Sequence, residues 1–83
     1  MKLSQLTKKK VHIIGINGIG MSALAVYLKK NKIDVSGSDI AKNSNTNVLN
    51  RNGINVIIGH KKENIKNKDI IFYSSAIKNN PEI

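Results

Sequence analysis

One stretch decides the fold of this chain: Val11-His-Ile-Ile-Gly15-Ile-Asn-Gly18-Ile-Gly20-Met-Ser22. In it, a short apolar run ends in three closely spaced glycines, and a helical pattern follows at once. Parallel α/β domains bind phosphate at such a strand-to-helix turn, because glycine lets the backbone approach a ligand and the first helical amides point at an anion. The stretch therefore predicts a site for a nucleotide-bearing ligand.

Predicted strands and helices alternate along the rest of the chain. Apolar runs predict strands at 10–14, 33–37, 54–58 and 69–73, and helical patterns predict helices at 19–30, 46–52 and, as a single turn, 63–68. The polar segment 43–47 is typical of a turn, and Asn80-Pro81-Glu82 predicts the start of a further helix. This alternation favours an α/β, Rossmann-like parallel sheet in strand order 3-2-1-4, which is half of a doubly wound domain.

The helix at 19–30 is expected to lie on the sheet through one apolar face. Its apolar positions recur at helical spacing, at Met21, Leu24, Ala25 and Leu28. Lys29 and Lys30 suit the negative end of the helix dipole, and Asn31 is predicted to end the helix in the left-handed conformation.

Composition restricts the class of protein. The chain has 83 residues, a net charge of +9 and no cysteine, which excludes disulfides and thiolate chemistry. It has no apolar run long enough to span a membrane and no secretory signal, so we expect a cytoplasmic domain, part of a longer protein, without a membrane partner. The lysines are scattered and aromatic residues make up 4%, which argues against nucleic acid and favours a small anionic ligand.

Several segments should meet at the carboxyl edge of the sheet, where open α/β sheets bind ligands. In the expected strand order the ligand site lies between the first and fourth strands, flanked by the loops 15–20 and 74–76. Asp39 follows Gly20 by 19 positions, where an acid commonly binds ribose hydroxyls. The candidate binding residues are Gly15, Asn17, Gly18, Ile19, Gly20, Ser38, Asp39, His60, Ser74, Ser75 and Ala76.

Each candidate also has an ordinary structural role that stays open. The glycine loop can be a tight turn without a ligand, in which Asn17 tolerates a positive φ. Ser38 and Asp39 suit an Asx turn or a helix cap, and the two serines after the fourth strand suit a turn. His60 can be a solvated loop histidine, while His12, within a buried strand, is expected to be structural.

The residues that catalysis would need are missing from the pattern. Met21 stands where a phosphate-loop NTPase requires lysine, which excludes an ATP-hydrolysing site here. The carboxylates are too scattered for an acid–base pair, and histidines and carboxylates lack metal-ligand spacing. We therefore expect binding, with no catalytic residue and no metal ligand in this chain.

At this point the chain resembles the UDP-N-acetylmuramate–L-alanine ligases of peptidoglycan synthesis, within the Mur ligase family. The stretch 11–22 looks like their opening motif, and Val35-Ser-Gly-Ser-Asp39 is similar to their second-strand motif. Ile58-Gly-His60 and Tyr73-Ser-Ser-Ala-Ile77, with Asn80-Pro-Glu82, complete a pattern that covers residues 11–82. The related ligase that recycles murein peptides is not expected to have Tyr-Ser-Ser-Ala at the fourth motif.

The resemblance implies that residues 1–83 form the N-terminal, UDP-binding domain of a three-domain cytoplasmic enzyme. Gly18, Ile19 and Gly20 would hold the diphosphate, Asp39 and His60 would lie near the uridine, and residues 74–76 would line the same pocket. The whole enzyme would use ATP and magnesium (Mg²⁺) to activate the muramoyl carboxylate for attack by L-alanine, in domains that this chain lacks.

Two residues depart from the family pattern. Asn17 stands where the family usually has glycine, which would tighten the approach of the diphosphate, and Lys32 stands where a glycine often ends the first helix. The alternative hypothesis is an NAD(P)-binding module of a dehydrogenase or a regulatory sensor, which shares the glycine loop and Asp39 but does not require the fourth-strand motif.

Overall fold

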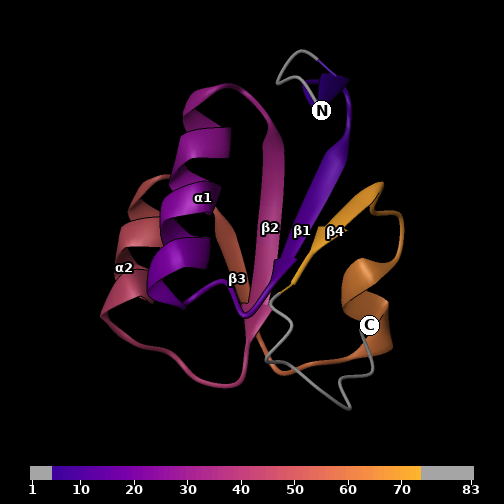
Figure 1. The fold of residues 1–83 in the computed structure, drawn as a ribbon. Coiled ribbons are helices and arrows are strands. Elements are labelled where there is room, and N and C mark those ends of the chain that lie inside the picture. The colour runs from indigo at the N-terminus through magenta and orange to yellow at the C-terminus, as the bar shows by residue number, and fades with distance from the viewer. Residues whose placement is uncertain (1–4, 74–83) are drawn as a thin grey trace.

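A computed structural model describes residues 5–73, in which helices and strands alternate as the sequence predicts (Figure 1). Its elements are β1 (Lys10–Ile14), α1 (Ile19–Lys30), β2 (Asp34–Asp39), α2 (Ser44–Arg51), β3 (Asn55–Ile58), the 3₁₀ helix η2 (Lys62–Ile65) and β4 (Ile70–Phe72). The helix predicted to start at residues 80–82 lies outside the described residues.

The strands form one parallel sheet in the order β3-β2-β1-β4, which confirms the predicted topology. In register, Val11 of the central strand pairs with Val35 on one side and Ile70 on the other. Because all the strands run the same way, the loops that follow β1, β2 and β3 gather at one edge. That edge is the lower end of the sheet in Figure 1.

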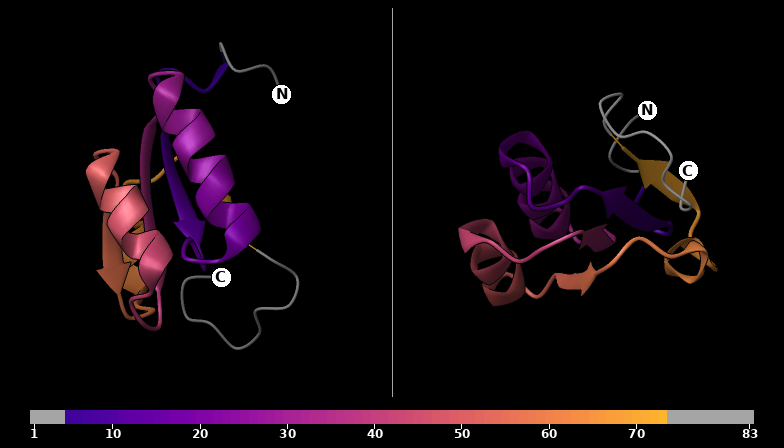
Figure 2. Two further views of the ribbon diagram at one scale, coloured as in Figure 1. Left: turned by 90° about the vertical axis from the view of Figure 1, so that its left-hand side faces the viewer. Right: turned by 90° about the horizontal axis from the view of Figure 1, so that it is seen from below.

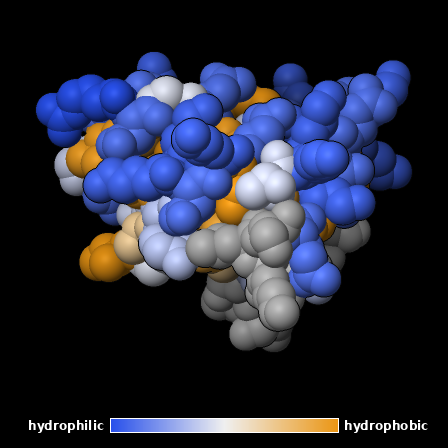
Figure 3. Space-filling model, turned by 90° about the horizontal axis from the view of Figure 1, so that it is seen from above, coloured by the Kyte–Doolittle hydropathy of each residue, from blue (hydrophilic) through white to orange (hydrophobic). Residues whose placement is uncertain are grey.

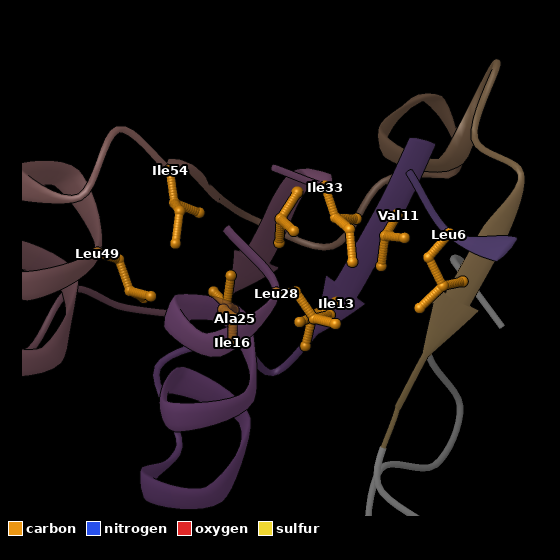
Figure 4. Packing of buried hydrophobic residues seen from close by; sticks show 10 residues of the cluster. Leu6, Val11, Ile13, Ile16, Ala25, Leu28, Ile33, Leu49 and Ile54 are labelled. Atoms are coloured by element: carbon orange, nitrogen blue, oxygen red, sulfur yellow. The ribbon is translucent and has the colours of Figure 1, made fainter. Parts of the chain in front are cut away.

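Both α-helices cover the same face of the sheet, and η2 lies on the opposite side (Figure 2). Their apolar residues and those of the sheet form one buried cluster (Figure 4) that includes Val11, Ile13, Ile16, Ala25, Leu28, Ile33, Leu49 and Ile54. Met21 and Leu24 are partly buried against this cluster, so the apolar face predicted for α1 is confirmed.

Gly37 is the point where the glycine loop packs onto the sheet. A Cβ atom at this position would lie 2.6 Å from the Cβ of Ile16 and 2.8 Å from the carbonyl oxygen of Ile13. Both distances are far below van der Waals contact, so only glycine lets the buried Ile16 side chain rest on β2. The packing of this pair sets how closely the loop approaches the second strand.

The second helix begins earlier than its apolar pattern predicts, at Ser44 rather than Thr46, so the interpretation of 43–47 as a turn is wrong. The reason is a capping box. The Asn43 side chain accepts hydrogen bonds from the backbone of Asn45 and Thr46, and the Thr46 hydroxyl accepts one from the Asn43 amide. These bonds satisfy the first amides of the helix, which lets it start among polar residues.

The end of α1 also differs from the expectation. Asn31 caps the helix with φ −95°, outside the left-handed region, whereas Lys32 adopts φ 64°. The Lys32 amide donates to the carbonyl of Lys29 at 3.0 Å, and the Ile33 amide donates to that of Leu28 at 3.2 Å. The helix end therefore needs its left-handed residue one position later than predicted, at the residue that stands where relatives were expected to have glycine.

Candidate functional site

The candidate site is built at the carboxyl ends of β1 and β2 by the glycine loop. Gly15 turns the chain out of β1 with φ 79°, a conformation that favours glycine. The amides of Gly15 and Ile16 then both donate to the carbonyl of Ser38, at 2.8 and 3.1 Å. The Gly18 amide donates back to the Gly15 carbonyl at 3.1 Å, which closes the turn just before α1 begins.

The N-terminus of α1 is open. Gly18 is the N-cap, no side chain bonds to the cap, and the first turn contains no acidic residue. The Ser22 amide is the first to reach a helical acceptor, the Gly18 carbonyl at 2.8 Å. The amides of Ile19, Gly20 and Met21 therefore have no acceptor within the helix.

The segment that carries the first of these amides is exposed. Gly18 and Gly20 are exposed, and Ile19 is 86% exposed. A Cβ atom added to Gly20 would meet nothing within 4 Å. No side chain of residues 5–73 caps the positive end of the helix dipole, which suits an anion such as phosphate.

Asn17 holds the loop to the segment that follows β2, and its side chain is buried at 3% exposure. Its backbone amide donates to the Asp39 carboxylate at 2.9 Å, and its side-chain amide donates to the Ala41 carbonyl at 2.7 Å. Its carbonyl accepts from the side chains of Asn43 and Asn45, at 3.2 and 2.9 Å.

Asn17 does not have the positive φ that its place in a glycine motif suggested. Its side chain turns into the protein, toward Ala41, so it does not lie over the exposed amides. The substitution of asparagine for glycine is therefore accommodated on the inner side of the loop.

Asp39 lies beside the loop, as the sequence predicted, but both of its carboxylate oxygens are occupied by backbone amides. Oδ2 accepts from Asn17 at 2.9 Å and Oδ1 from Ile40 at 2.8 Å. Asp39 therefore has the structural role that the sequence left open for it. Its carboxylate holds backbone amides from two loops, the one that precedes α1 and the one that follows β2. The Asp39 carbonyl also accepts from the Gly59 amide at 2.8 Å, which brings the end of β3 to the same edge.

Ser38 is placed beneath the loop instead of on its surface. Its side chain is fully buried and its hydroxyl lies 3.1 Å from Nε2 of His12. Nδ1 of the same histidine lies 3.1 Å from the Ser36 hydroxyl, so His12 has a structural position between two serines. Ser36 and Ser38 share one face of β2 because side chains alternate along a strand, and the sequence alternation could have revealed this.

His60 follows Gly59, which has φ 112°, and is half-buried near the carboxyl edge. The Asn64 side chain donates to the Gly59 carbonyl at 2.9 Å and ties this loop to η2. Ser74, Ser75 and Ala76 lie outside the described residues, so their expected place in the pocket stays a prediction.

Exposed lysines lie at both edges of the sheet, and at the carboxyl edge Lys42 follows β2 while Lys61 and Lys62 follow β3. Viewed from the amino ends of the strands, at the opposite end of the sheet, the surface is mostly hydrophilic (Figure 3). The residues at the start of β1 and at the end of α1 place six exposed or half-buried lysines there: Lys8, Lys9, Lys10, Lys29, Lys30 and Lys32. The larger lysine cluster thus lies away from the α1 N-terminus, and at the carboxyl edge the backbone amides are joined by the three exposed lysines that follow β2 and β3.

The other surface features do not form a competing site. A groove of about 420 Å³ between α1 and α2 is mainly apolar and is lined by Ser22, Ala23, Val26, Tyr27, Lys30 and Val48. Within residues 5–73 no three His, Cys, Asp or Glu side chains lie close enough to hold a metal ion. Over the same residues, neither helix has the length and apolar character needed to cross a bilayer.

Comparisons with known proteins agree on one family. A family model described as the Mur ligase family, catalytic domain, matches residues 10–83. The UDP-N-acetylmuramate–L-alanine ligase of Aquifex aeolicus is 50% identical over 76 residues, which are 90% of this chain and 17% of that protein.

Two solved structures have the same fold. The UDP-N-acetylmuramate-alanine ligase of Thermotoga maritima superposes with a TM-score of 0.84 at 38% identity, over 90% of this chain and 18% of the other. A murein peptide ligase from Psychrobacter arcticus superposes with a TM-score of 0.80 at 25% identity, over 86% and 15%. The chain thus spans less than a fifth of the length of these relatives.

Proposed function

The chain belongs to the Mur ligase family, and from that membership we propose that its carboxyl-edge site binds the UDP moiety of UDP-N-acetylmuramate. The protein to which it belongs would be an ATP-dependent ligase that adds L-alanine to this precursor in peptidoglycan synthesis. The observation that carries the proposal is the N-terminus of α1, where three amides without helical acceptors follow an exposed N-cap that no side chain of residues 5–73 bonds. A diphosphate is an anion of the right kind for such a site.

The diphosphate would lie across the exposed segment Gly18, Ile19 and Gly20, with its oxygens directed at the amides of Ile19, Gly20 and Met21. An anion at a helix N-terminus gains roughly 0.3–2 kcal/mol from the dipole, and charge-assisted bonds to the amides add to this. The uridine would extend toward the ends of β2 and β3, where Asp39 and His60 lie. Ser74, Ser75 and Ala76 would complete the pocket from the end of β4.

In this proposal, the chain contributes substrate binding to the reaction. ATP with magnesium supplies the phosphoryl group that activates the muramoyl carboxylate in this proposal. Residues 5–73 do not fit those groups, because the described carboxylates and histidines form no metal cluster and Met21 replaces the phosphate-loop lysine. The ATP, magnesium and L-alanine sites would therefore belong to other domains, and a ligase that uses ATP and a UDP-linked precursor would act in the cytoplasm.

Fold alone does not separate the two kinds of ligase that superpose on this chain, since their TM-scores are 0.84 and 0.80. Sequence identity favours the L-alanine ligase, at 50% and 38% against 25% for the murein peptide ligase. The proposal therefore takes its substrate from the first group.

Chemical-shift mapping by NMR tests the proposal on the 83-residue chain. UDP-N-acetylmuramate, NAD and a short oligonucleotide are titrated separately into the labelled protein. We expect the UDP-sugar alone to shift the amides of Ile19, Gly20 and Met21, with smaller shifts at His60. An equal response to NAD would favour the dinucleotide alternative, and shifts confined to the lysine-rich amino edge would contradict both.

A further inference from the structure

We propose that Asp39 is a positioning residue for the glycine loop and not the group that reads the ribose. Its carboxylate would fix the loop in the shape that turns the α1 amides outward. The inference rests on the proposed function and deepens it, since it assigns separate tasks to the residues of the same site.

The first support is the occupancy of the carboxylate. Oδ2 accepts the Asn17 amide at 2.9 Å and Oδ1 accepts the Ile40 amide at 2.8 Å, so each oxygen holds a backbone group. Asn17 lies 22 positions before Asp39, in the middle of the loop that precedes α1. The carboxylate therefore joins the ends of β1 and β2, and a ribose hydroxyl would have to share an oxygen that already accepts a backbone amide.

The second support is that the backbone carbonyl and the side-chain NH₂ group of Asn17 also bond to the segment that follows β2. Its carbonyl accepts from Asn43 and Asn45, and its side chain donates to the Ala41 carbonyl. With both backbone polar groups of Asn17 and its side-chain amide turned inward, the next amides without helical acceptors are those of Ile19, Gly20 and Met21. The set of bonds around Asn17 thus decides which amides face a ligand.

The direction in which diphosphate affinity changes separates an effect of the Asp39 charge from an effect on the shape of the loop. A carboxylate beside a bound diphosphate repels it, so neutralising Asp39 would tighten diphosphate binding if charge alone mattered. The amide of an asparagine at position 39 would instead direct an NH₂ donor at one of the two backbone donors. That mismatch would loosen the loop and weaken diphosphate binding.

The experiment compares Asp39→Asn with the original chain for two probes, UDP and 2′-deoxy-UDP, by isothermal titration calorimetry. We expect Asp39→Asn to weaken both probes by about tenfold, as loss of one charge-assisted bond implies, and to leave the ratio of their affinities unchanged. The matched control is Asp34→Asn, which makes the same charge change at the exposed, opposite end of β2 and should stay within about twofold.

Two results overturn the inference. If Asp39→Asn removes the preference for UDP over 2′-deoxy-UDP, the carboxylate reads the ribose. If it binds UDP as tightly as the original chain or more tightly, the carboxylate does not position the loop.

A spectroscopic readout separates this inference from the proposed function. In the ligand-free chain, Asp39→Asn should move the Asn17 amide resonance upfield, because that amide loses its carboxylate acceptor, whereas Asp34→Asn should leave it in place. If the original chain binds neither probe, the proposed function fails while this shift still reports on the bond to Asp39.

A second variant keeps the inference testable if Asp39→Asn does not fold. Asn45→Ala removes one of the two side-chain donors to the Asn17 carbonyl and leaves the carboxylate intact. We expect it to weaken UDP and 2′-deoxy-UDP by the same factor, about threefold for one neutral bond. Unchanged affinity for both would contradict the positioning role of the bonds around Asn17.

Discussion

Replacing Gly37 by alanine tests whether close packing on β2 seats the glycine loop. The added Cβ would lie 2.6 Å from the Cβ of Ile16 and 2.8 Å from the carbonyl oxygen of Ile13. Both neighbours are fully buried, and although the nearest atom is the Cδ1 end of Ile16, the Ile16 Cβ and the Ile13 oxygen cannot be moved aside by a side-chain rotation. Overpacking of a core costs about 1–3 kcal/mol, and we expect Gly37→Ala to lie at the upper end of that range.

Thermal unfolding followed by circular dichroism measures this cost. A domain of this size loses roughly 4–8 °C of melting temperature per kcal/mol, so Gly37→Ala should melt about 12–24 °C lower. The matched control is Gly20→Ala, where the added methyl meets nothing within 4 Å. Because alanine is favoured over glycine in a helix by about 0.5–1 kcal/mol, the control should melt at the same temperature or a few degrees higher.

A melting temperature of Gly37→Ala within about 3 °C of the original chain would contradict close packing at this position, since such a small loss lies below the range expected for overpacking. An equal loss in Gly20→Ala would also refute it, because the effect would then come from losing any glycine. A lowered melting temperature in Gly37→Ala alone supports the packing of Ile16 on β2.

Three further substitutions have expected outcomes. Lys32→Gly should raise the urea midpoint by the equivalent of about 1 kcal/mol, because Lys32 holds φ 64°, while Lys30→Gly inside α1 should lower it. Asn43→Ala should cost about 1 kcal/mol of unfolding free energy through loss of the α2 cap. Asn43→Asp should keep the cap but set a carboxylate oxygen against the Asn17 carbonyl, which calorimetry would show as weaker UDP binding, with a smaller loss of stability than Asn43→Ala. Gly20→Ala should keep its fold yet bind UDP several-fold more weakly, because its methyl would occupy the space before the α1 amides; unchanged affinity would move the anion elsewhere.

Much of the fold could be predicted from local sequence alone. The alternation of apolar runs and helical patterns predicted the parallel order β3-β2-β1-β4, because short connections and crossover rules leave few other arrangements. The boundaries were less predictable. Asn43 begins α2 through a capping box that apolar periodicity does not register, and the left-handed residue after α1 is Lys32 instead of Asn31.

The candidate site, like the fold, could be predicted from the sequence only in part. The glycine pattern predicted an open helix N-terminus, and the position of Asp39 after the second strand predicted that it would lie beside that loop. What Asp39 bonds to could not be predicted, since its partner Asn17 lies 22 positions away and meets it only when β1 and β2 pair.

By itself, the sequence determined the order of the elements of this protein and the existence of a glycine-rich strand-to-helix turn, because both follow from backbone preferences and periodicities among near neighbours. Only the tertiary structure decided which polar groups of the carboxyl edge bond to other parts of the protein. It turned Ser38 inward to His12 and occupied both oxygens of Asp39 with backbone amides. Those choices depend on bonds between loops that are distant in sequence, and they arise only when the strands are side by side.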